Sequence, residues 1–185
     1  MKFEIQYFPN ISFFSSLKSE DLIIEKHENY QKGGLRNKCT ILSANGLMNL
    51  SIPLKKGKNS KQNILDVKIS YDYDWQKHHW MSIKSAYGKS AFFVDYENLI
   101  EKLVLKKYDF LFDFNLNIIE NLKTHLCIPN DLKFSQVFEK ELFDKKEKNT
   151  FKIYNQVFSE RFEFQENLSI IDLLFNMGPE SNLYL

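Results

Sequence analysis

The sequence predicts an α/β protein, in which a mixed β-sheet that contains a β-hairpin packs against helices mostly from the C-terminal half. Strand-like segments occupy much of residues 1–70. A turn signal, Asn45-Gly46, joins two apolar arms. From Trp75 onward, apolar residues recur every three or four positions, as one face of a helix requires. Residues 1–185 are expected to form a single domain, because this length is usual for one domain.

The N-terminal segment is expected to open with a strand, a short helix and a second strand. Residues 2–8 and 21–29 have strand-like composition. Residues 11–17 between them place apolar side chains on one helical face, and Asn10 can cap that helix. This order predicts a βαβ-like unit, although the helix is short for a crossover connection.

The predicted hairpin spans residues 37–54. Asn45-Gly46 is a preferred two-residue turn, since both central residues of such a turn have positive φ. The basic segment 55–61 is rich in turn-forming residues and is interpreted as a solvated loop, although a cationic loop could also close over an anion. Residues 64–70 alternate between apolar and polar and predict a half-buried strand.

Helical patterns dominate the second half of the chain. Residues 75–87 and 97–125 carry apolar residues at helical spacing, and the second stretch could be two helices that are broken near Asp109. The charged segment 143–150 is interpreted as a loop.

The C-terminal helix has clear boundary signals. Ser169 and Asp172 have the spacing of a capping box, which accounts for the carboxylate of Asp172 without a functional role. Gly178-Pro179 is a stop signal, so residues 170–177 are predicted to form a short helix.

Composition restricts the class of protein. The chain has 25 Lys and Arg against 24 Asp and Glu, which argues against a nucleic-acid partner because phosphate binding needs a cationic excess. No apolar run reaches the ~18 residues of a membrane span, and the N-terminus does not resemble a signal peptide. We therefore expect a cytoplasmic location. Cys39 and Cys127 are expected to be reduced thiols, and neither a metal nor a cofactor is expected because no metal-like His or Cys spacing occurs.

Two adjacent histidines occupy different faces of the predicted helix 75–87. At about 100° per residue, His79 lies within the apolar arc and His78 points to nearly the opposite side. A buried His79 could be an ordinary core residue with satisfied nitrogens, or a general base at the edge of a pocket. Tyr87, on the same face, could supply a hydroxyl or be a core aromatic.

A basic loop around two glycines precedes the hairpin. Glycines allow the backbone to approach a ligand, and an arginine can bind a carboxylate or phosphate with two hydrogen bonds. Neither a Walker loop nor a dinucleotide fingerprint is present, and a solvated basic turn is the simpler interpretation. The residues concerned are Lys32, Gly33, Gly34, Arg36, Asn37 and Lys38.

Several ordered motifs resemble the WbqC-like protein family and extend over nearly the whole chain. They are "YFPNISFF", "EKHENYQKGGLRNKCTILSANG", "LSIP", "WQKHHWMSIKSAYGKSAFF", "YNQVF" and "NLSIIDLLFNMGPES". The resemblance implies a bacterial protein of O-antigen or related surface-polysaccharide biosynthesis. One role that it implies is transfer of glycine or a similar acyl or aminoacyl group onto a sugar.

The resemblance also implies site residues. The family motifs match this chain at Arg36-Asn37, at His79-Trp80 and at Tyr87, whereas His78 and Cys39 have no such standing. Lys38 stands where an arginine is frequent in the family, which puts a bidentate role there in doubt.

Two functional hypotheses follow. In the first, the protein is a transferase: His79 deprotonates the sugar, and Arg36 and Lys32 hold a carboxylate or phosphate of the donor or of a nucleotide-sugar. Tyr87 and Asn37 orient the small-molecule substrate. In the second, the protein is a non-catalytic binding or assembly protein of the same pathway, and Arg36 is structural.

Overall fold

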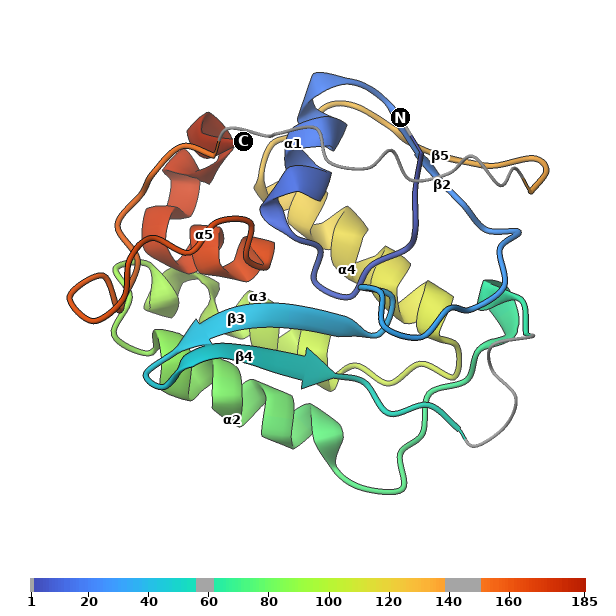
Figure 1. Ribbon diagram of the computed structural model, residues 1–185, viewed down its shortest axis with the longest axis horizontal. Coiled ribbons are helices and arrows are strands. Elements are labelled where there is room, and N and C mark those ends of the chain that lie inside the picture. The colour runs from blue at the N-terminus through green and yellow to red at the C-terminus, as the bar shows by residue number, and fades with distance from the viewer. Residues whose placement is uncertain (1, 56–61, 139–150) are drawn as a thin grey trace.

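The computed structural model of the chain describes residues 2–55, 62–138 and 151–185 and has the predicted α/β fold class (Figure 1). The segments 56–61 and 143–150, interpreted above as loops, lie outside the described residues. In chain order the elements are β1 (Lys2–Phe3), α1 (Ile11–Ser19), β2 (Leu22–Ile24), β3 (Lys38–Ser43), β4 (Gly46–Ser51), η2 (Ile64–Asp66), α2 (Trp75–Tyr87), α3 (Phe93–Leu105), α4 (Leu111–His125), β5 (Leu132–Phe134), α5 (Ile170–Met177) and η3 (Gly178–Tyr184).

Parallel and antiparallel pairing occur in two separate sheets. The parallel sheet has the order β1-β2-β5, and Ile24 of β2 pairs with Phe3 on one side and Phe134 on the other. The predicted strand–helix–strand opening is therefore confirmed. Both strands are shorter than predicted: the chain leaves the sheet after Phe3 and buries Tyr7 and Phe8 in the core, and β2 ends at Ile24.

The predicted hairpin is confirmed, but its turn begins one residue earlier than predicted. Ser43 pairs with Gly46, so Ala44 and Asn45 form the loop. Within the hairpin the positive φ is found at Gly46, at 100°, and not at Asn45. Glycine adopts this conformation without a steric penalty, which explains how the hairpin closes at this residue.

The prediction of a strand over residues 64–70 was wrong. Residues Ile64–Asp66 form the 3₁₀ helix η2, because the side chain of Asn63 accepts a 2.9 Å hydrogen bond from the backbone of Leu65. Only isolated bridges follow, such as the one between Lys68 and Phe110. An alternating apolar pattern cannot distinguish a strand from a capped turn that buries the same residues.

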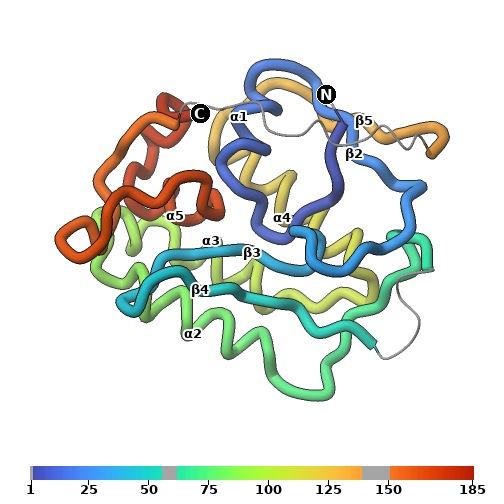
Figure 2. Tube along the Cα trace, in the orientation of Figure 1, coloured from blue at the N-terminus to red at the C-terminus, as the bar shows by residue number. Residues whose placement is uncertain are grey.

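The helical region matches the prediction closely. α2 has the predicted bounds, and the long pattern over 97–125 is two helices, α3 and α4, separated by residues 106–110. α3 begins earlier than predicted, at Phe93. α2 packs against β3 and α3, and the tube in Figure 2 shows α2 running along the hairpin.

The C-terminal helix α5 is confirmed, but its capping box is not formed. The hydroxyl of Ser169 donates to the backbone carbonyl of Phe8 at 2.9 Å, and the side chain of Asp172 is fully buried instead of facing the helix start. Both side chains therefore have partners in other parts of the chain. Gly178, with a φ of 52°, ends the helix.

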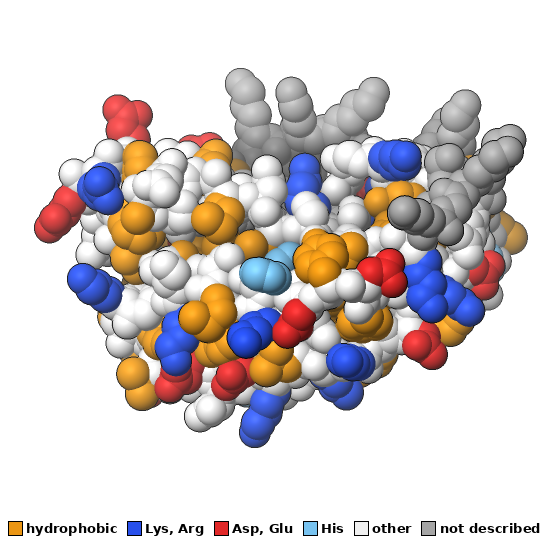
Figure 3. Space-filling model, turned by 90° about the horizontal axis from the view of Figure 1, so that it is seen from below, with side chains coloured by type: hydrophobic (Ala, Val, Ile, Leu, Met, Phe, Trp, Pro, Cys, Tyr) orange, Lys and Arg blue, Asp and Glu red, His pale blue; other side chains and the backbone are white. Residues whose placement is uncertain are grey.

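The surface on the side of α2 carries intermixed basic, acidic and hydrophobic side chains (Figure 3). Exposed hydrophobic residues occur both on α2, at Met81, and in the hairpin, at Leu47. Among the residues that the structure describes, no helix is long and apolar enough to cross a membrane.

Candidate functional site

Arg36 lies just before β3 in a buried ion-pair cluster. Its side chain is 3% exposed, and its Nε and Nη2 donate to the two carboxylate oxygens of Glu28 at 2.8 Å and 2.5 Å. Its Nη1 also pairs with Glu4. Burial acts to lower the pKa of Arg36, but the two carboxylates outweigh it, so the pKa is raised. The guanidinium is thus held by protein carboxylates.

The two glycines of the same loop are required for different structural reasons. Gly33 has a φ of 87°, a conformation that favours glycine. Gly34 is required by close approach, since a Cβ atom there would lie 2.6 Å from Nη1 of Arg36. Gly34 therefore makes room for the Arg36 ion pairs, whereas Gly33 allows the backbone conformation of the loop.

Asn37 joins the loop to the end of the hairpin. Its side-chain oxygen accepts a 3.0 Å hydrogen bond from the hydroxyl of Tyr30, and its Nδ2 donates to the carbonyl of Ile52 at 2.9 Å. Lys32, in contrast, is exposed on the loop. Of the three residues predicted to bind substrate, Arg36 and Asn37 are held by protein groups, and Lys32 faces solvent.

His79 is buried and His78 is exposed, as the helical geometry predicted. Nδ1 of His79 shares a 2.9 Å hydrogen bond with the hydroxyl of Tyr7. Burial lowers the pKa of His79 to about 4. The imidazole is therefore neutral near pH 7.

Tyr87 anchors the C-terminal end of α2. Its hydroxyl accepts a 3.3 Å hydrogen bond from the backbone N–H of Leu42 and donates to Oδ1 of Asp172 at 2.9 Å. His79 and Tyr87 are eight residues apart, which is about 12 Å along a helix axis. The two predicted catalytic residues therefore have partners in different parts of the chain and do not meet at one reacting atom.

Asp172 is the centre of a buried polar network. Its Oδ2 accepts hydrogen bonds from the hydroxyl of Tyr154 at 2.6 Å and from Nε2 of Gln156 at 3.0 Å. The Nε2 of Gln156 also donates to the carbonyl of Gln165. With the hydroxyl of Tyr87, three groups donate hydrogen bonds to this side chain. This arrangement suits an ionised carboxylate, which only accepts hydrogen bonds. Burial, the largest influence, nevertheless raises the pKa of Asp172.

This network was not predicted from the sequence, although the sequence contains a signal for it. α5 is apolar around almost its whole circumference, and such a helix is buried on all sides. A carboxylate in its middle must then be buried as well and needs hydrogen-bond donors. The donors Tyr154 and Gln156 come from an irregular segment, so nothing in their spacing identifies them.

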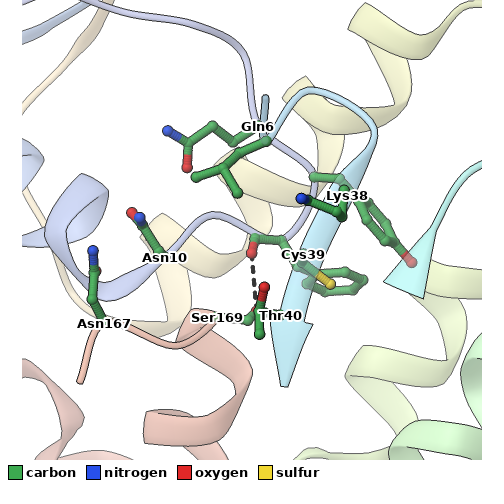
Figure 4. Close-up of a pocket in the computed structure, with 10 residues that line it drawn as sticks. Gln6, Asn10, Lys38, Cys39, Thr40, Asn167 and Ser169 are labelled. Carbon is green, nitrogen blue, oxygen red and sulfur yellow. Dashed lines mark hydrogen bonds between the residues drawn. The ribbon is translucent and has the colours of Figure 1, made fainter. Parts of the chain in front are cut away.

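A small polar cavity of about 40 Å³ lies between residues 6–10, the start of β3 and the segment before α5 (Figure 4). In this view the amide ends of Gln6, Asn10 and Asn167 gather on one side, and Lys38 and Thr40 extend from β3 on the other. The side chain of Gln6 is 4% exposed, and its Oε1 has no hydrogen-bond partner among the described residues. A buried acceptor of this kind is expected to be completed by a ligand or a water.

The backbone beside this cavity is strained at two positions. Phe8 has a φ of 38° and Asn167 has a φ of 53°, and both residues line the cavity. A left-handed phenylalanine is uncommon and persists only where the surroundings impose it. Here the carbonyl of Phe8 is held by Ser169, as described above.

The predicted residues do not line this cavity. The cavity wall includes Tyr7, the partner of His79, and Leu35 and Lys38, which flank Arg36-Asn37 in the chain. Three of the predicted residues adjoin its wall: Arg36 and Asn37 are next to lining residues in the chain, and His79 bonds to Tyr7. Tyr87 has no contact of this kind among its hydrogen bonds. Sequence reasoning named these supporting residues and missed Gln6, which looks like an ordinary strand residue.

Thiol and metal chemistry receive little support from the described part of the chain. Cys39 and Cys127 are free thiols, as predicted, and burial raises the pKa of Cys39, which makes it a poor nucleophile. Among the described residues no group of three or more His, Cys, Asp or Glu side chains could hold a metal ion.

The comparison with family models gives one match. The model described as the WbqC-like protein family matches residues 5–162, which is most of the chain. Neither the curated proteins nor the solved structures contain a significant match. Gln6, Lys38 and the buried residues Arg36 and His79 all lie within the matched range.

Proposed function

Because the chain belongs to the WbqC-like protein family, we propose that it is a cytoplasmic transferase that attaches glycine or another small acyl or aminoacyl group to a sugar. The sugar belongs to a bacterial surface polysaccharide or its nucleotide-sugar precursor. The observation that carries the proposal is the polar cavity, whose lining includes Lys38 and, opposite it, Gln6, a residue with a buried Oε1 that has no hydrogen-bond partner among the described residues.

The chemistry of the cavity suits a small aminoacyl group. Its volume of about 40 Å³ is room for roughly three water-sized groups. The amino end of a glycyl group can donate a hydrogen bond to Oε1 of Gln6. Its carbonyl oxygen can face the ammonium of Lys38, which would stabilise the negative charge that develops on that oxygen during acyl transfer.

The proposed reaction needs an activated donor such as a thioester. The sugar amine attacks the carbonyl carbon, so that a C–N bond forms and the C–S bond breaks with its electron pair leaving on sulfur. The ammonium proton of the new bond passes to the departing thiolate or to solvent. Lys38 and Gln6 are the groups proposed to touch the transferred group.

Four residues of the family motifs are proposed to position these groups. Arg36 and Asn37 fix the start of β3 and hence Lys38, while His79 fixes Tyr7 in the cavity wall. Tyr87 fixes the C-terminal end of α2. The exposed Lys32 remains a proposed contact for a phosphate or carboxylate of the substrate.

Complementation in the host tests this function. The gene is deleted and restored as wild type or as Lys38→Met, Gln6→Leu or Lys84→Met, and NMR measures the amide- or ester-linked substituents of the surface polysaccharide. Lys84 is exposed on α2 and serves as the matched control. We expect wild type and Lys84→Met to restore a substituent that the deletion loses, and the folded cavity variants to fail. Full restoration by both cavity variants would contradict the proposed site.

A second function, a non-catalytic binding or assembly protein of the same pathway, is favoured by one observation. Arg36, Asn37, His79 and Tyr87 all have hydrogen-bond partners within the protein. Under this alternative the deletion loses the substituent, and variants of Lys38 and Gln6 restore it.

A further inference from the structure

A second and larger cavity, of about 490 Å³, lies beside the C-terminal part of the chain. The segment over residues 153–164 and the region from the end of α5 through η3 contribute its lining. In Figure 1 these orange and red segments lie together at one end of the molecule. The proposed transfer reaction does not involve this cavity, and part of the cavity lining lies beyond the residues that the family model matches.

Aromatic rings form the walls of this cavity at right angles to one another. The ring of Tyr154 meets that of Phe164 at 5.2 Å with an interplanar angle of 85°, and that of Tyr184 at 5.9 Å with an angle of 78°. Phe162 is a fourth aromatic residue in the lining. Perpendicular rings cannot sandwich one flat ligand, so this arrangement disfavours a nucleobase. It suits a ligand with C–H groups on several sides, because ring faces are electron-rich and attract them.

The polar residues in the lining are suited to hydroxyl groups. Asn155, Ser159 and Glu163 are exposed members of the lining and supply amide, hydroxyl and carboxylate groups. Hydroxyls of a ligand both donate and accept hydrogen bonds, so this mixture can satisfy them. Among the residues that the structure describes, the lining includes no Lys or Arg, which disfavours a phosphate or carboxylate ligand.

The inner wall of the cavity is held rigidly. Tyr154 and Gln156 line it with only 6% and 3% of their surfaces exposed, and both donate hydrogen bonds to Asp172. Asp172 is in turn bonded to Tyr87 of α2. A preformed wall lowers the entropic cost of binding a ligand against it.

We infer that this aromatic cavity binds a pyranose ring that carries no negative charge, either a neutral sugar or an amino sugar. The apolar faces of the ring lie against the aromatic walls, and its polar substituents face Asn155, Ser159 and Glu163. An ammonium group on the sugar is favoured by the carboxylate of Glu163. The inference goes beyond the proposed function and does not rest on it, because the two cavities share no lining residue.

Saturation-transfer NMR with the full chain tests the inference. The probes are methyl glucopyranoside and its 2-amino-2-deoxy analogue, with adenosine and glucose 6-phosphate as counter-probes. We expect transfer to both glycosides, at millimolar affinity and more strongly to the amino sugar, and none to the counter-probes. Transfer to neither glycoside, or transfer to adenosine alone, would overturn the inference.

Variants distinguish this site from the cavity at Lys38. We expect Tyr184→Leu to weaken glycoside binding at least tenfold, and Glu163→Gln to remove the preference for the amino sugar. The matched control is Leu183→Ala, since Leu183 is 62% exposed and does not line the cavity. Lys38→Met is expected to leave glycoside binding unchanged, so that failure of the proposed transferase site and failure of this sugar site are separate results. Unchanged binding in Glu163→Gln, or in folded Tyr184→Leu, would place the sugar elsewhere and overturn the inference.

Discussion

Both carboxylate oxygens of Glu28 accept hydrogen bonds from the guanidinium of Arg36, and the two side chains are 1% and 3% exposed. The sequence of this loop is basic, but the positive charge of its arginine is paired with a carboxylate inside the protein. The pair sits at the entry to β3, so it fixes the backbone that carries Lys38 into the polar cavity.

Removal of the arginine is expected to destabilise the fold strongly. Arg36→Met leaves Glu28 buried without its cation, and breaking a buried pair in this way costs about 3–5 kcal/mol. Urea unfolding measures the free energy of unfolding, with Lys32→Met as the control. Lys32 is exposed, so its change is expected to stay within about 0.5 kcal/mol. Equal small effects of the two substitutions would contradict the ion-pair account.

The two glycines of the loop are expected to differ in what they tolerate. Gly34→Ala places a methyl group against Arg36 and is expected to cost about 1–3 kcal/mol of unfolding free energy. Gly33 has open space around its Cβ position and a positive φ, so Gly33→Asn is expected to cost less, because asparagine tolerates that conformation. Thermal unfolding of both variants checks the order, and a reversed order would be inconsistent with the close contact at Gly34.

His79 is expected to make stability depend on pH in a defined window. Its pKa is lowered from 6.5 in the unfolded chain to about 4 in the fold, so the unfolded state binds more protons between these values. This contribution is fully present above pH 6.5 and is lost as the pH falls toward 4, by up to about 3 kcal/mol. Urea unfolding at several pH values measures the loss.

The matched pair for this test is His79→Gln and His78→Gln. His78 is the exposed neighbour on the same helix, so His78→Gln should retain the pH dependence, whereas His79→Gln should reduce it. An NMR titration in which His79 changes protonation near pH 6.5 would show that it is not the buried, neutral imidazole described here.

Asp172 is expected to be sensitive to the loss of its charge. Asp172→Asn replaces one acceptor oxygen with an amide that must face a hydroxyl or amide donor, and is expected to cost about 3 kcal/mol of unfolding free energy. Tyr87→Phe removes one of the three donors and is expected to cost about 2 kcal/mol. Denaturant unfolding of both variants and of the double variant measures the coupling. Strict additivity would mean that Tyr87 and Asp172 do not interact as described.

Much of the architecture could be predicted because local patterns dictate it. The bounds of α2 and α5 followed from apolar spacing and end signals, and the face of α2 that buries His79 and not His78 followed from helical geometry alone. The separation of the sheets and the 3₁₀ turn at Ile64 depend on contacts between distant segments, which local patterns do not contain.

The candidate site could be predicted only in part. The sequence singled out Arg36 and His79, but their partners Glu28 and Tyr7 are 8 and 72 residues away, so their engagement within the protein could not be foreseen. Gln6 has no distinguishing feature in the sequence, because its importance lies in a buried oxygen that has no partner among the described residues. That property belongs to the packed structure alone.

Binding of a small probe to the polar cavity tests the central claim most directly. We would titrate ¹⁵N-labelled protein with glycine and with acetate, and follow the side-chain amide of Gln6 and the backbone amides of Thr40 and Asn167. The account predicts saturable shifts at these positions in the wild type, and their loss in Lys38→Met while Lys84→Met behaves as wild type. Absence of any shift at these three residues with either probe would contradict the claim that this cavity receives the transferred group.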